Sequence, residues 1–506
     1  MKLNKIMSTK NVACQILSSL LLIVFAELKA ADTTRVEVGP GVHQIRIIDR
    51  ELPRHIVALE IDISRPENRI EMALANDRLD SGFETVDNIA RRKQSDNRVV
   101  IGAVNADYFG ISDPMNPYTF LRNSMVMDGQ LVFTGFRDIA HFGILDDGSP
   151  FIGSVEFEGW LRTDDGSKLA ISGVNNERTA ESPVVLFNSW FGDRTTSISD
   201  GMKWRLIPDR EPVLNEPVTY TVESVSEAEE LDLTNGHVVL SVDESVTGVL
   251  SGSLQPGNQV EIFTGLHALY PSRTDANGPD YLPGEDNRRF KQLTGGGPHL
   301  LLNGEHVTDD FLEFQGFSER HSGMRHNRSA VGFNKDTTRI ILAAIDGRQP
   351  KFSVGATPAE TADIMRDLGA WNAVNLDGGG STTLIVRERM ANRHDDKGTM
   401  RPVANALVVT SELNIPEITS CLRIFPPGEM HIRHGETVIF NTRLIDRWGY
   451  ELPVLPDEQK WDVASEISRI DRNGALIFTG DAEGMHDIIS RFHEWADTVR
   501  VHVAPN

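Results

Sequence analysis

The sequence predicts an α+β fold in two parts: a strand-rich domain with few helices, followed by an all-β sandwich. Between residues 34 and 407, short apolar runs of β-type composition alternate with Gly, Asn, Asp and Pro. Only two segments in that region have the apolar spacing of a clear helix. The pattern changes near residue 414, and the 506-residue length allows two or three domains of about 150 residues each.

The first thirty residues have the pattern of a secretory signal. Lys2, Lys5 and Lys10 precede an apolar run over 16–26, and the small residue Ala30 ends the segment. This run is shorter than the roughly 20 residues that span a bilayer. We therefore expect a signal peptide over 1–30, a secreted or periplasmic protein, and no stable membrane span after its removal. The alternative is an N-terminal anchor with the same flanking residues.

The strand-rich domain is expected over 34–413. Its strands are predicted from short runs of β-branched and aliphatic residues that end at turn-forming residues. The clearest of these runs cover 56–63, 99–104, 238–242, 260–263, 338–345 and 373–376.

Two helices are expected in this domain. In the first, Thr357 is placed to cap the helix, Pro358 suits the first helical position, and Glu360 completes a capping box. Gly369 marks its end. Because expected strands precede and follow this helix, the segment is a β-α-β unit. The second helix is expected over 85–93, where a small apolar face recurs at helical spacing.

The segment 414–506 is predicted to form a separate β-sandwich. Short alternating runs recur about every ten residues and are separated by turn signals such as Arg447-Trp448-Gly449. The segment resembles the bacterial immunoglobulin-like modules in several motifs. These are Gly435-Glu436-Thr437, Asp446-Arg447-Trp448-Gly449, Trp461-Asp462-Val463 and Ile470-Asp471-Arg472-Asn473-Gly474.

Charge and cysteine content exclude some classes of function. The 50 Lys and Arg against 73 Asp and Glu give a net charge of −23, which repels the phosphate backbone of nucleic acids. Any anionic ligand therefore requires a local cationic pocket. Cys14 lies in the expected signal, so Cys421 is the only thiol expected in the mature chain. Neither an intrachain disulfide nor a cysteine-ligated zinc site is then possible.

Polar residues gather where two expected strands end. Asn105 and Asp107 follow one strand, and Asn375 and Asp377 follow another; each pair shares one face of an extended chain. The second pair leads into three glycines at 378–380, whose exposed backbone N–H groups suit an anion or a sugar oxygen. The alternatives are an Asx-rich strand end and a flexible hairpin tip, respectively.

A basic cluster lies between these two stretches. Five of the ten residues over 320–329 are Arg or His, including His326 and Arg328. Arginine presents a planar set of donors that matches phosphate oxygens, so this cluster is a candidate anion site in an acidic chain. The alternative is a solvated basic loop. Asp346 and Arg348 close a later strand and add a carboxylate and a guanidinium.

Together these stretches resemble the phosphodiester glycosidase family, which includes the N-acetylglucosamine-1-phosphodiester α-N-acetylglucosaminidases. The resemblance spans most of residues 34–410. Asn327 and Ser329 depart from the Pro and Thr common in the family but leave Arg328 in place. The motifs are Asn105-Ala106-Asp107-Tyr108-Phe109, Gly295-Gly296-Gly297-Pro298, the stretch 326–332, Asp346-Gly347-Arg348, Ser353-Val354-Gly355, the stretch 375–383 and Arg401-Pro402-Val403-Ala404-Asn405-Ala406.

The resemblance implies hydrolysis of a sugar-1-phosphodiester in a glycan or cell-envelope polymer. The candidate catalytic carboxylates are Asp107, Asp377 and Asp346, whose roles stay unranked, and Arg328 and Arg348 are expected to neutralise the phosphate. The remaining candidates for substrate binding are Asn105, Asn375, Gly378, Gly379, Gly380, Ser381, Thr382, Gly296, Gly297 and His326.

Two further points stay open at the level of sequence. No cofactor is required by this chemistry. The alternative is that the carboxylates bind a divalent cation such as calcium or magnesium. The alternative function is a non-catalytic extracellular protein that binds glycans. The sequence does not specify the sugar, the aglycone, the stereochemical outcome or the oligomeric state.

Overall fold

The computed structural model describes most of the chain from residue 31 onward. The signal peptide expected over 1–30 lies outside the described residues. The described ranges are 31–95, 98–110, 121–135, 139–197, 200–248, 254–274, 278–284, 288–318, 323–395, 399–452, 457–463 and 467–505.

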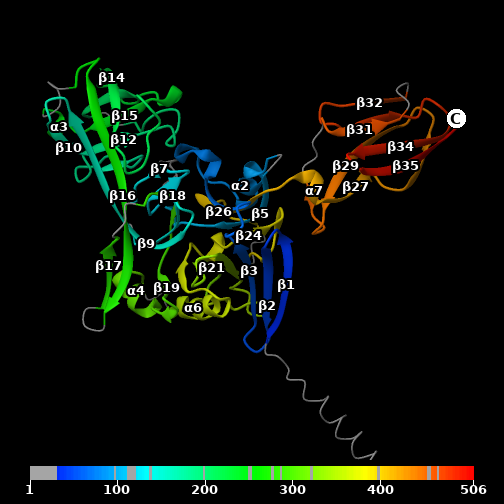
Figure 1. Ribbon diagram of the computed structural model, residues 1–506, viewed down its shortest axis with the longest axis horizontal. Helices are drawn as coiled ribbons and strands as arrows, with labels where there is room; N and C mark the ends of the chain where they lie inside the picture. Colours follow the sequence, from blue (N-terminus) through cyan, green and yellow to red (C-terminus); the bar gives the residue numbers. More distant parts are fainter. Residues whose placement is uncertain are drawn as a thin grey trace, which may run out of the picture.

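Two sheets form the centre of the molecule (Figure 1). Sheet A has eight strands in the spatial order β1 (Ala31–Gly39), β2 (Val42–Asp49), β3 (Arg54–Asp62), β22 (Arg339–Ile345), β21 (Arg328–Phe333), β23 (Asn372–Asn375), β19 (His299–Leu302) and β20 (Glu305–His306). Sheet B has five strands in the order β25 (Arg389–Met390), β24 (Leu384–Val386), β5 (Arg98–Asn105), β26 (Asn405–Glu412) and β4 (Asn68–Leu74).

The centre has four layers, with a helix outside each sheet. Leu59 and Leu342 of sheet A share one core with Ile101 and Leu407 of sheet B. The opposite face of sheet A packs against α6 (Pro358–Asp367), and that of sheet B packs against α2 (Val86–Lys93). In Figure 1, α6 lies at the bottom of the centre and α2 at its top. Because both faces are covered at the middle of each sheet, the central strands β3, β21, β22, β5 and β26 are buried almost throughout, whereas the edge strand β1 is largely exposed.

Both helices predicted from the sequence are present. Thr357 Oγ1 accepts a hydrogen bond from the Glu360 amide, and the Glu360 carboxylate accepts one from the Thr357 amide, so the capping box is formed. The helix connects β22 to β23, and both strands pair antiparallel with β21, which lies between them. The β-α-β unit is therefore a crossover that passes over one strand. Among the described residues the other α-helices are α3 (Glu244–Thr247), α4 (Thr308–Phe314) and α7 (Ile415–Ile418).

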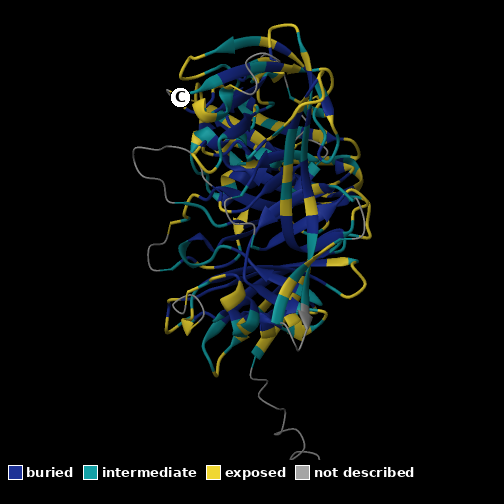
Figure 2. Cartoon of the chain, turned by 90° about the vertical axis from the view of Figure 1, so that its left-hand side faces the viewer, coloured by how far each residue is buried: buried dark blue, intermediate teal, exposed yellow. Residues whose placement is uncertain are grey.

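A lobe with its own core extends from the centre, and the sequence did not predict this division. Its core includes Trp204, Leu240 and Leu266. Figure 2 shows the buried residues of the chain in dark blue. The lobe belongs to a thirteen-stranded sheet whose main order is β11 (Gly173–Val174), β12 (Val184–Phe187), β15 (Val238–Val242), β13 (Met202–Pro208), β14 (Val218–Ser226), β16 (Gln259–Thr274), β9 (Pro150–Thr163), β8 (His141–Leu145), β18 (Phe290–Gly295), β6 (Met125–Met127) and β7 (Gln130–Phe133), with β10 (Lys168–Ala170) on β9 and β17 (Gly278–Pro283) on β16.

The C-terminal segment contains two further sheets, and its resemblance to immunoglobulin-like modules stays a prediction. One sheet has the order β27 (Thr419–Phe425), β29 (Thr437–Asp446), β33 (Leu476–Thr479) and β32 (Ser468–Ile470), with β30 (Glu451–Leu452) on β29. The other has the order β28 (Glu429–Arg433), β35 (Trp495–Ala504), β34 (Gly484–Phe492) and β31 (Gln459–Asp462).

A buried ion pair joins this segment to the centre. Arg387, in the turn between β24 and β25, pairs with Asp446 at the end of β29, and both side chains are almost fully buried. The Asp446 carboxylate also accepts hydrogen bonds from the amides of Trp448 and Tyr450. The contact therefore links a hairpin of sheet B to a turn of the C-terminal segment.

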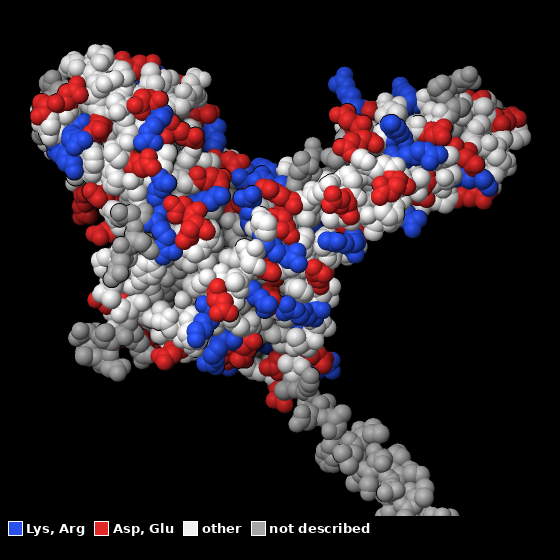
Figure 3. All heavy atoms as spheres, viewed as in Figure 1, with Lys and Arg blue, Asp and Glu red and all other residues white. Residues whose placement is uncertain are grey.

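On the face shown in Figure 3, acidic and basic side chains are interspersed over the centre, the lobe and the C-terminal segment. Cys421 is a free thiol. Within the described ranges, no helix combines the length and the apolar character needed to cross a bilayer.

Candidate active site

A cavity of about 260 Å³ opens where β21 begins and β23 ends. Six of its eight lining residues are among those predicted from the sequence. The cavity therefore brings the basic cluster and the Asp-Gly turn together, although they are far apart in the chain. The eight residues are Tyr108, Ser318, His326, Arg328, Arg348, Asp377, Gly378 and Gly379.

The backbone of Asp377 is held at the junction of the two central sheets. Its amide donates to the Ala106 carbonyl at 2.9 Å, and its carbonyl accepts from Asn105 Nδ2 at 2.7 Å. Asn105 ends β5 of sheet B and Ala106 follows it, whereas Asp377 lies two residues after the end of β23 of sheet A. The preceding residue, Leu376, donates to the Ser329 carbonyl on β21. These contacts fix the turn that carries the carboxylate.

The two predicted asparagines bind protein groups. Asn105 is fully buried; its Oδ1 accepts from Ser329 Oγ at 2.7 Å and from the Thr383 amide at 3.1 Å. Asn375 Nδ2 donates to Tyr108 Oη at 3.0 Å and to the Gly297 carbonyl at 3.2 Å. Neither asparagine lines the cavity. Their amides therefore hold the surrounding loops in place.

The triple glycine allows close packing around the turn. A Cβ at Gly378 would lie 2.8 Å from the Asn327 carbonyl oxygen. A Cβ at Gly379 would lie 2.9 Å from Arg348 Nη2, and one at Gly380 would lie 2.5 Å from Arg401 Nη2. Gly379 also has a φ of +62°, which disfavours a side chain. The glycines thus let two guanidinium groups approach the turn.

The amides of this turn are already engaged. The Gly378 amide donates to the Asp377 carboxylate at 2.9 Å, and the Gly379 amide donates to the Asn327 carbonyl at 2.9 Å. From the sequence alone, such amides are expected to bind an anion or a sugar oxygen. At these two positions the structure uses them to shape the turn.

Arg328 and Arg348 supply the positive charge of the cavity. Arg328 is only 1% exposed, and it donates to the carbonyls of Ala356 and Met324 at 3.0 and 3.1 Å. Burial lowers the pKa of Arg328, yet a guanidinium keeps its proton throughout the physiological range. Arg348 has a φ of +59°, and its Nε donates to His326 Nδ1 at 3.3 Å. Arg348 Nη1 also lies 3.6 Å from Asp395 Oδ2, so His326 and Asp395 together hold Arg348 at the cavity wall.

Two of the predicted carboxylates have perturbed acidity. Burial raises the pKa of Asp377 to about 6 from an ordinary 3.8, although hydrogen bonds from Ser381 and the Gly378 amide oppose the rise. Burial likewise raises the pKa of Asp107 to about 6. The Asp107 carboxylate accepts from the amide and the side chain of Asn123 at 3.0 and 2.7 Å. Carboxyl groups with such pKa values suit proton transfer near neutral pH.

Only Asp377 of the three predicted carboxylates lines the cavity. Asp107 is 2% exposed and lies beside Tyr108 in the chain. Asp346 is fully buried, 2.6 Å from His55 Nδ1, and it accepts from Asn392 Nδ2 and the Arg393 amide at 3.1 and 2.9 Å. Through these contacts Asp346 links its own segment to the segment of His55 and to that of Asn392 and Arg393.

The remaining predicted residues surround the cavity without lining it. The Gly297 carbonyl accepts from Tyr108 Oη at 2.7 Å, and the Gly296 amide donates to the Ala140 carbonyl. Ser381 and Thr382 are fully buried beyond the glycine turn. Part of the basic cluster, 320–322, lies outside the described residues.

Sequence reasoning missed three side chains near the site. Tyr108 and Ser318 line the cavity, and Arg401 lies against Gly380 and donates to Ser381 Oγ at 3.5 Å. Tyr108 and Arg401 occur in the quoted motifs, so those motifs carried a usable signal. Ser318 had no such signal.

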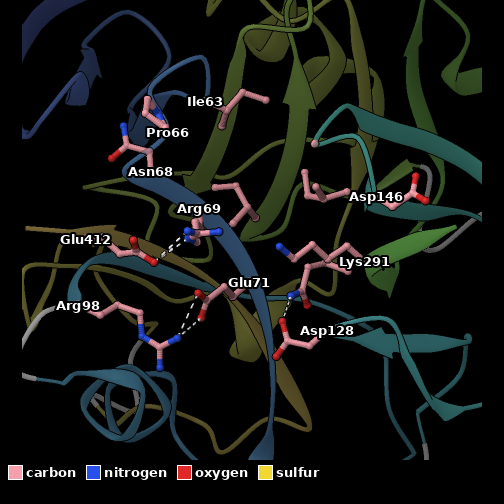
Figure 4. Close-up of a pocket in the computed structure, with 14 residues that line it drawn as sticks. Ile63, Pro66, Asn68, Arg69, Glu71, Arg98, Asp128, Asp146, Lys291 and Glu412 are labelled. Carbon is pink, nitrogen blue, oxygen red and sulfur yellow. Dashed lines mark hydrogen bonds and ion pairs between the residues drawn. The ribbon is translucent and has the colours of Figure 1, made fainter. Parts of the chain in front are cut away.

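Larger cavities occur elsewhere. One of about 460 Å³ lies between β4 and the β8–β18 part of the thirteen-stranded sheet (Figure 4). Its arginines are neutralised, because Arg69 pairs with Glu412 and Arg98 pairs with Glu71. The chemistry predicted from the sequence lies in the smaller cavity. In the part of the chain that the structure describes, no three His, Cys, Asp or Glu side chains cluster as metal ligands.

Solved structures share the fold of this chain. A hypothetical protein from Synechocystis is 19% identical, with a TM-score of 0.56, and the match covers 75% of this chain and 64% of that one. A Burkholderia pseudomallei protein described as exported is 22% identical, with a TM-score of 0.53, over 72% of this chain and 74% of that one. At these identities the likeness shows the fold alone.

A third structure is more distant. The catalytic domain of zebrafish N-acetylglucosamine-1-phosphodiester alpha-N-acetylglucosaminidase, auto-inhibited by its pro-peptide, is 15% identical over 75% of this chain and 88% of that one. Its TM-score of 0.36 is too low to place residues by superposition. No curated protein sequence matches the chain.

The family comparison matches part of the chain, from β14 to β26. The family model for phosphodiester glycosidases matches residues 222–410. This range contains Arg328, Arg348, Asp377 and the glycine turn, whereas Asn105 and Tyr108 precede it. The family predicted from the motifs is thereby confirmed: residues 222–410 carry a phosphodiester glycosidase domain.

Proposed function

We propose that this protein hydrolyses a glycosyl phosphodiester by breaking the bond between the anomeric carbon and the phosphate oxygen. The observation that carries the proposal is the cavity in which Asp377 lies with Arg328 and Arg348. A carboxylate is needed beside an oxocarbenium-like sugar carbon, and fixed positive charge is needed beside the departing phosphate. One cavity supplies both.

The two arginines bind and neutralise the phosphate. Arg328 is held by two backbone carbonyls, and Arg348 is supported by His326. Charged groups fixed in this way need little rearrangement as charge develops on the leaving oxygen. A phosphomonoester is a weak base when it departs, so charge neutralisation is the main requirement at that end of the bond.

Asp377 acts at the sugar. With a pKa of about 6 it is ionised at neutral pH, and it serves either as the nucleophile or as the base that accepts a proton from water. In the overall reaction the water oxygen joins the anomeric carbon, the carbon–oxygen bond to phosphate breaks, and one proton is released. Asp107 lies outside the cavity and its carboxylate is bound by Asn123, so Asp107, like Asp346, positions the surrounding loops.

The finer features of the function are also proposals. An N-acetylglucosaminide is supported by the family's motifs, and a glycan or cell-envelope polymer is supported by the expected export of the chain. The leader pattern over 1–30 supports a secreted or periplasmic location. The structural likeness to a protein described as exported agrees with that location.

The test is hydrolysis of a synthetic methyl phosphodiester of N-acetylglucosamine 1-phosphate in water enriched in oxygen-18. The proposal expects the label in the released sugar, because the carbon–oxygen bond breaks. Label in the phosphate would overturn it in favour of a phosphodiesterase. The Asp377→Asn variant is expected to lose turnover, whereas the control Asp363→Asn, on the exposed side of α6, is expected to keep it. Sugar binding without any release would favour the non-catalytic alternative.

A further inference from the structure

The C-terminal segment carries three metal-binding side chains in one row across a sheet. His431 of β28 is the register partner of His502 of β35, and His502 is the register partner of Met485 of β34. Residues that face each other across neighbouring strands project from the same side of the sheet. The three side chains therefore form one continuous row, which we call the His-His-Met row (β34 and β35 in Figure 1).

This row faces outward from the sandwich. Ile432 and Val501, adjacent to His431 and His502, are buried in the core, and so is Ile488, three residues beyond Met485 on β34. Because side chains alternate along a strand, the row lies on the opposite, solvent side. Met485 is 54% exposed, so a ligand from solution has access to its sulfur.

The two imidazoles already have the spacing of ligands on a common metal ion. Their Nδ1 atoms lie 3.1 Å apart, and their ring planes are inclined by 80°. Two nitrogens at about 2.0 to 2.1 Å from a tetrahedral ion are about 3.3 Å apart. In this structure the 3.1 Å contact is a hydrogen bond between the two Nδ1 atoms. An ion replaces it when the bridging proton moves to the Nε2 atom of its ring and the rings turn slightly, without a change of strand register.

The third side chain selects the kind of ion. Thioether sulfur is a soft ligand that favours Cu(I), whereas imidazole also binds Zn(II). Methionine is unbranched and has three rotatable bonds, so its sulfur can adjust to an ion held by the histidines. The nearest carboxylate on β34 and the same face, Asp487, is bound by Arg500 at 2.7 Å. The row thus offers two nitrogens and one sulfur.

We propose that His431, His502 and Met485 form a surface binding site for Cu(I). The site lies on the C-terminal segment and uses no residue of the active-site cavity. It is independent of the proposed hydrolysis, since neither the cavity nor its carboxylates take part.

The test is an anaerobic titration with Cu(I), in competition with a chromophoric Cu(I) chelator, of the chain from residue 31 onward, purified without a polyhistidine tag. The chain carries Cys421→Ser, because the free thiol of Cys421 would itself bind Cu(I). One equivalent is expected to bind, and X-ray absorption is expected to show nitrogen and sulfur ligands. His431→Ala and His502→Ala are each expected to weaken binding by about tenfold or more, the scale on which even an outer-shell partner acts. His493→Ala, at the exposed hairpin between β34 and β35, is the matched control and is expected to bind as the parent does.

Met485→Leu distinguishes a Cu(I) site from a Zn(II) site, since it keeps the size of the side chain and removes the sulfur. It is expected to weaken Cu(I) binding about tenfold and to leave Zn(II) binding unchanged. The control Met390→Leu, at another exposed methionine, is expected to change neither. Unchanged Cu(I) affinity in Met485→Leu, or in either histidine variant, would overturn the proposal. Loss of Cu(I) binding in Glu429→Gln would also overturn it, because a carboxylate would then replace the soft ligand.

Discussion

Replacing Asp377 with Asn is expected to stabilise the fold while it abolishes catalysis. In the folded chain the Asp377 carboxyl keeps its proton up to a pH of about 6, whereas in the unfolded chain it loses the proton near the ordinary pKa of 3.8. That difference corresponds to about 3 kcal/mol against the folded state once the carboxyl is ionised. Asp377 keeps partial contact with solvent, so we discount this to about 1 to 2 kcal/mol. The amide oxygen of Asn can still accept from Gly378.

The difference in stability between the parent and Asp377→Asn is expected to depend on pH. Between pH 3.8 and 6 the folded state binds more protons than the unfolded state, so the parent loses stability as pH rises through this window. The advantage of Asp377→Asn is therefore expected in urea denaturation at pH 8 and is expected to vanish near pH 4. Parent turnover is expected to fall as pH drops through about 6, because the reactive carboxylate becomes protonated.

Asp363→Asn, at an exposed position, is expected to show no such pH-dependent gain. If Asp377→Asn were less stable than the parent at pH 8, burial would not destabilise the ionised carboxyl, and the expectation would be wrong. Retained turnover in the same variant would remove Asp377 from the chemistry.

Three further changes test other parts of the structure. Arg328→Ala should weaken the transition state by about 2 to 4 kcal/mol and should harm phosphodiesters more than glycosides with good neutral leaving groups; equal loss on both would contradict its phosphate role. Gly380→Ala should displace the neighbouring guanidinium and cut kcat by up to about 10²-fold, whereas Gly248→Ala, which has open space around it, should not; unchanged kcat would contradict the packing argument. A chain ending at Leu413 should keep turnover but melt at a lower temperature by scanning calorimetry, since Arg387 loses its buried partner; loss of turnover with an intact fold would mean that the C-terminal segment completes the site.

Local features of the fold were predictable because neighbouring residues determine them. The capping box at Thr357 and Glu360 depends on contacts within one turn, and it formed as expected. The strand β15 has the bounds that its apolar run predicted, because both of its faces are buried. The Asp-Gly turn and the basic cluster were also recognisable, since three consecutive glycines, and five Arg or His among ten residues of an acidic chain, are unusual concentrations. Together they identified the family.

Packing between distant segments decided the rest. No local pattern indicates that the two sheets stack between α6 and α2, or that the lobe has a separate core, because such contacts join residues hundreds of positions apart. The same limit applies to single side chains. Asn105 was expected to hold a sugar, but its buried position commits it to Asp377 and Ser329. Arg401 approaches the site only because Gly380 lacks a Cβ.

The order of amino acids specifies which chemical groups the chain contains: the carboxylates, the arginines, the glycine turn and the alternating strands. Tertiary structure decided which of them meet. Asp377 reaches the cavity while Asp346 is turned toward His55. Likewise, His431 meets His502 only through strand register, a relation between separate segments. The physical reason is that side-chain type is local, whereas burial and proximity arise when separate segments pack together.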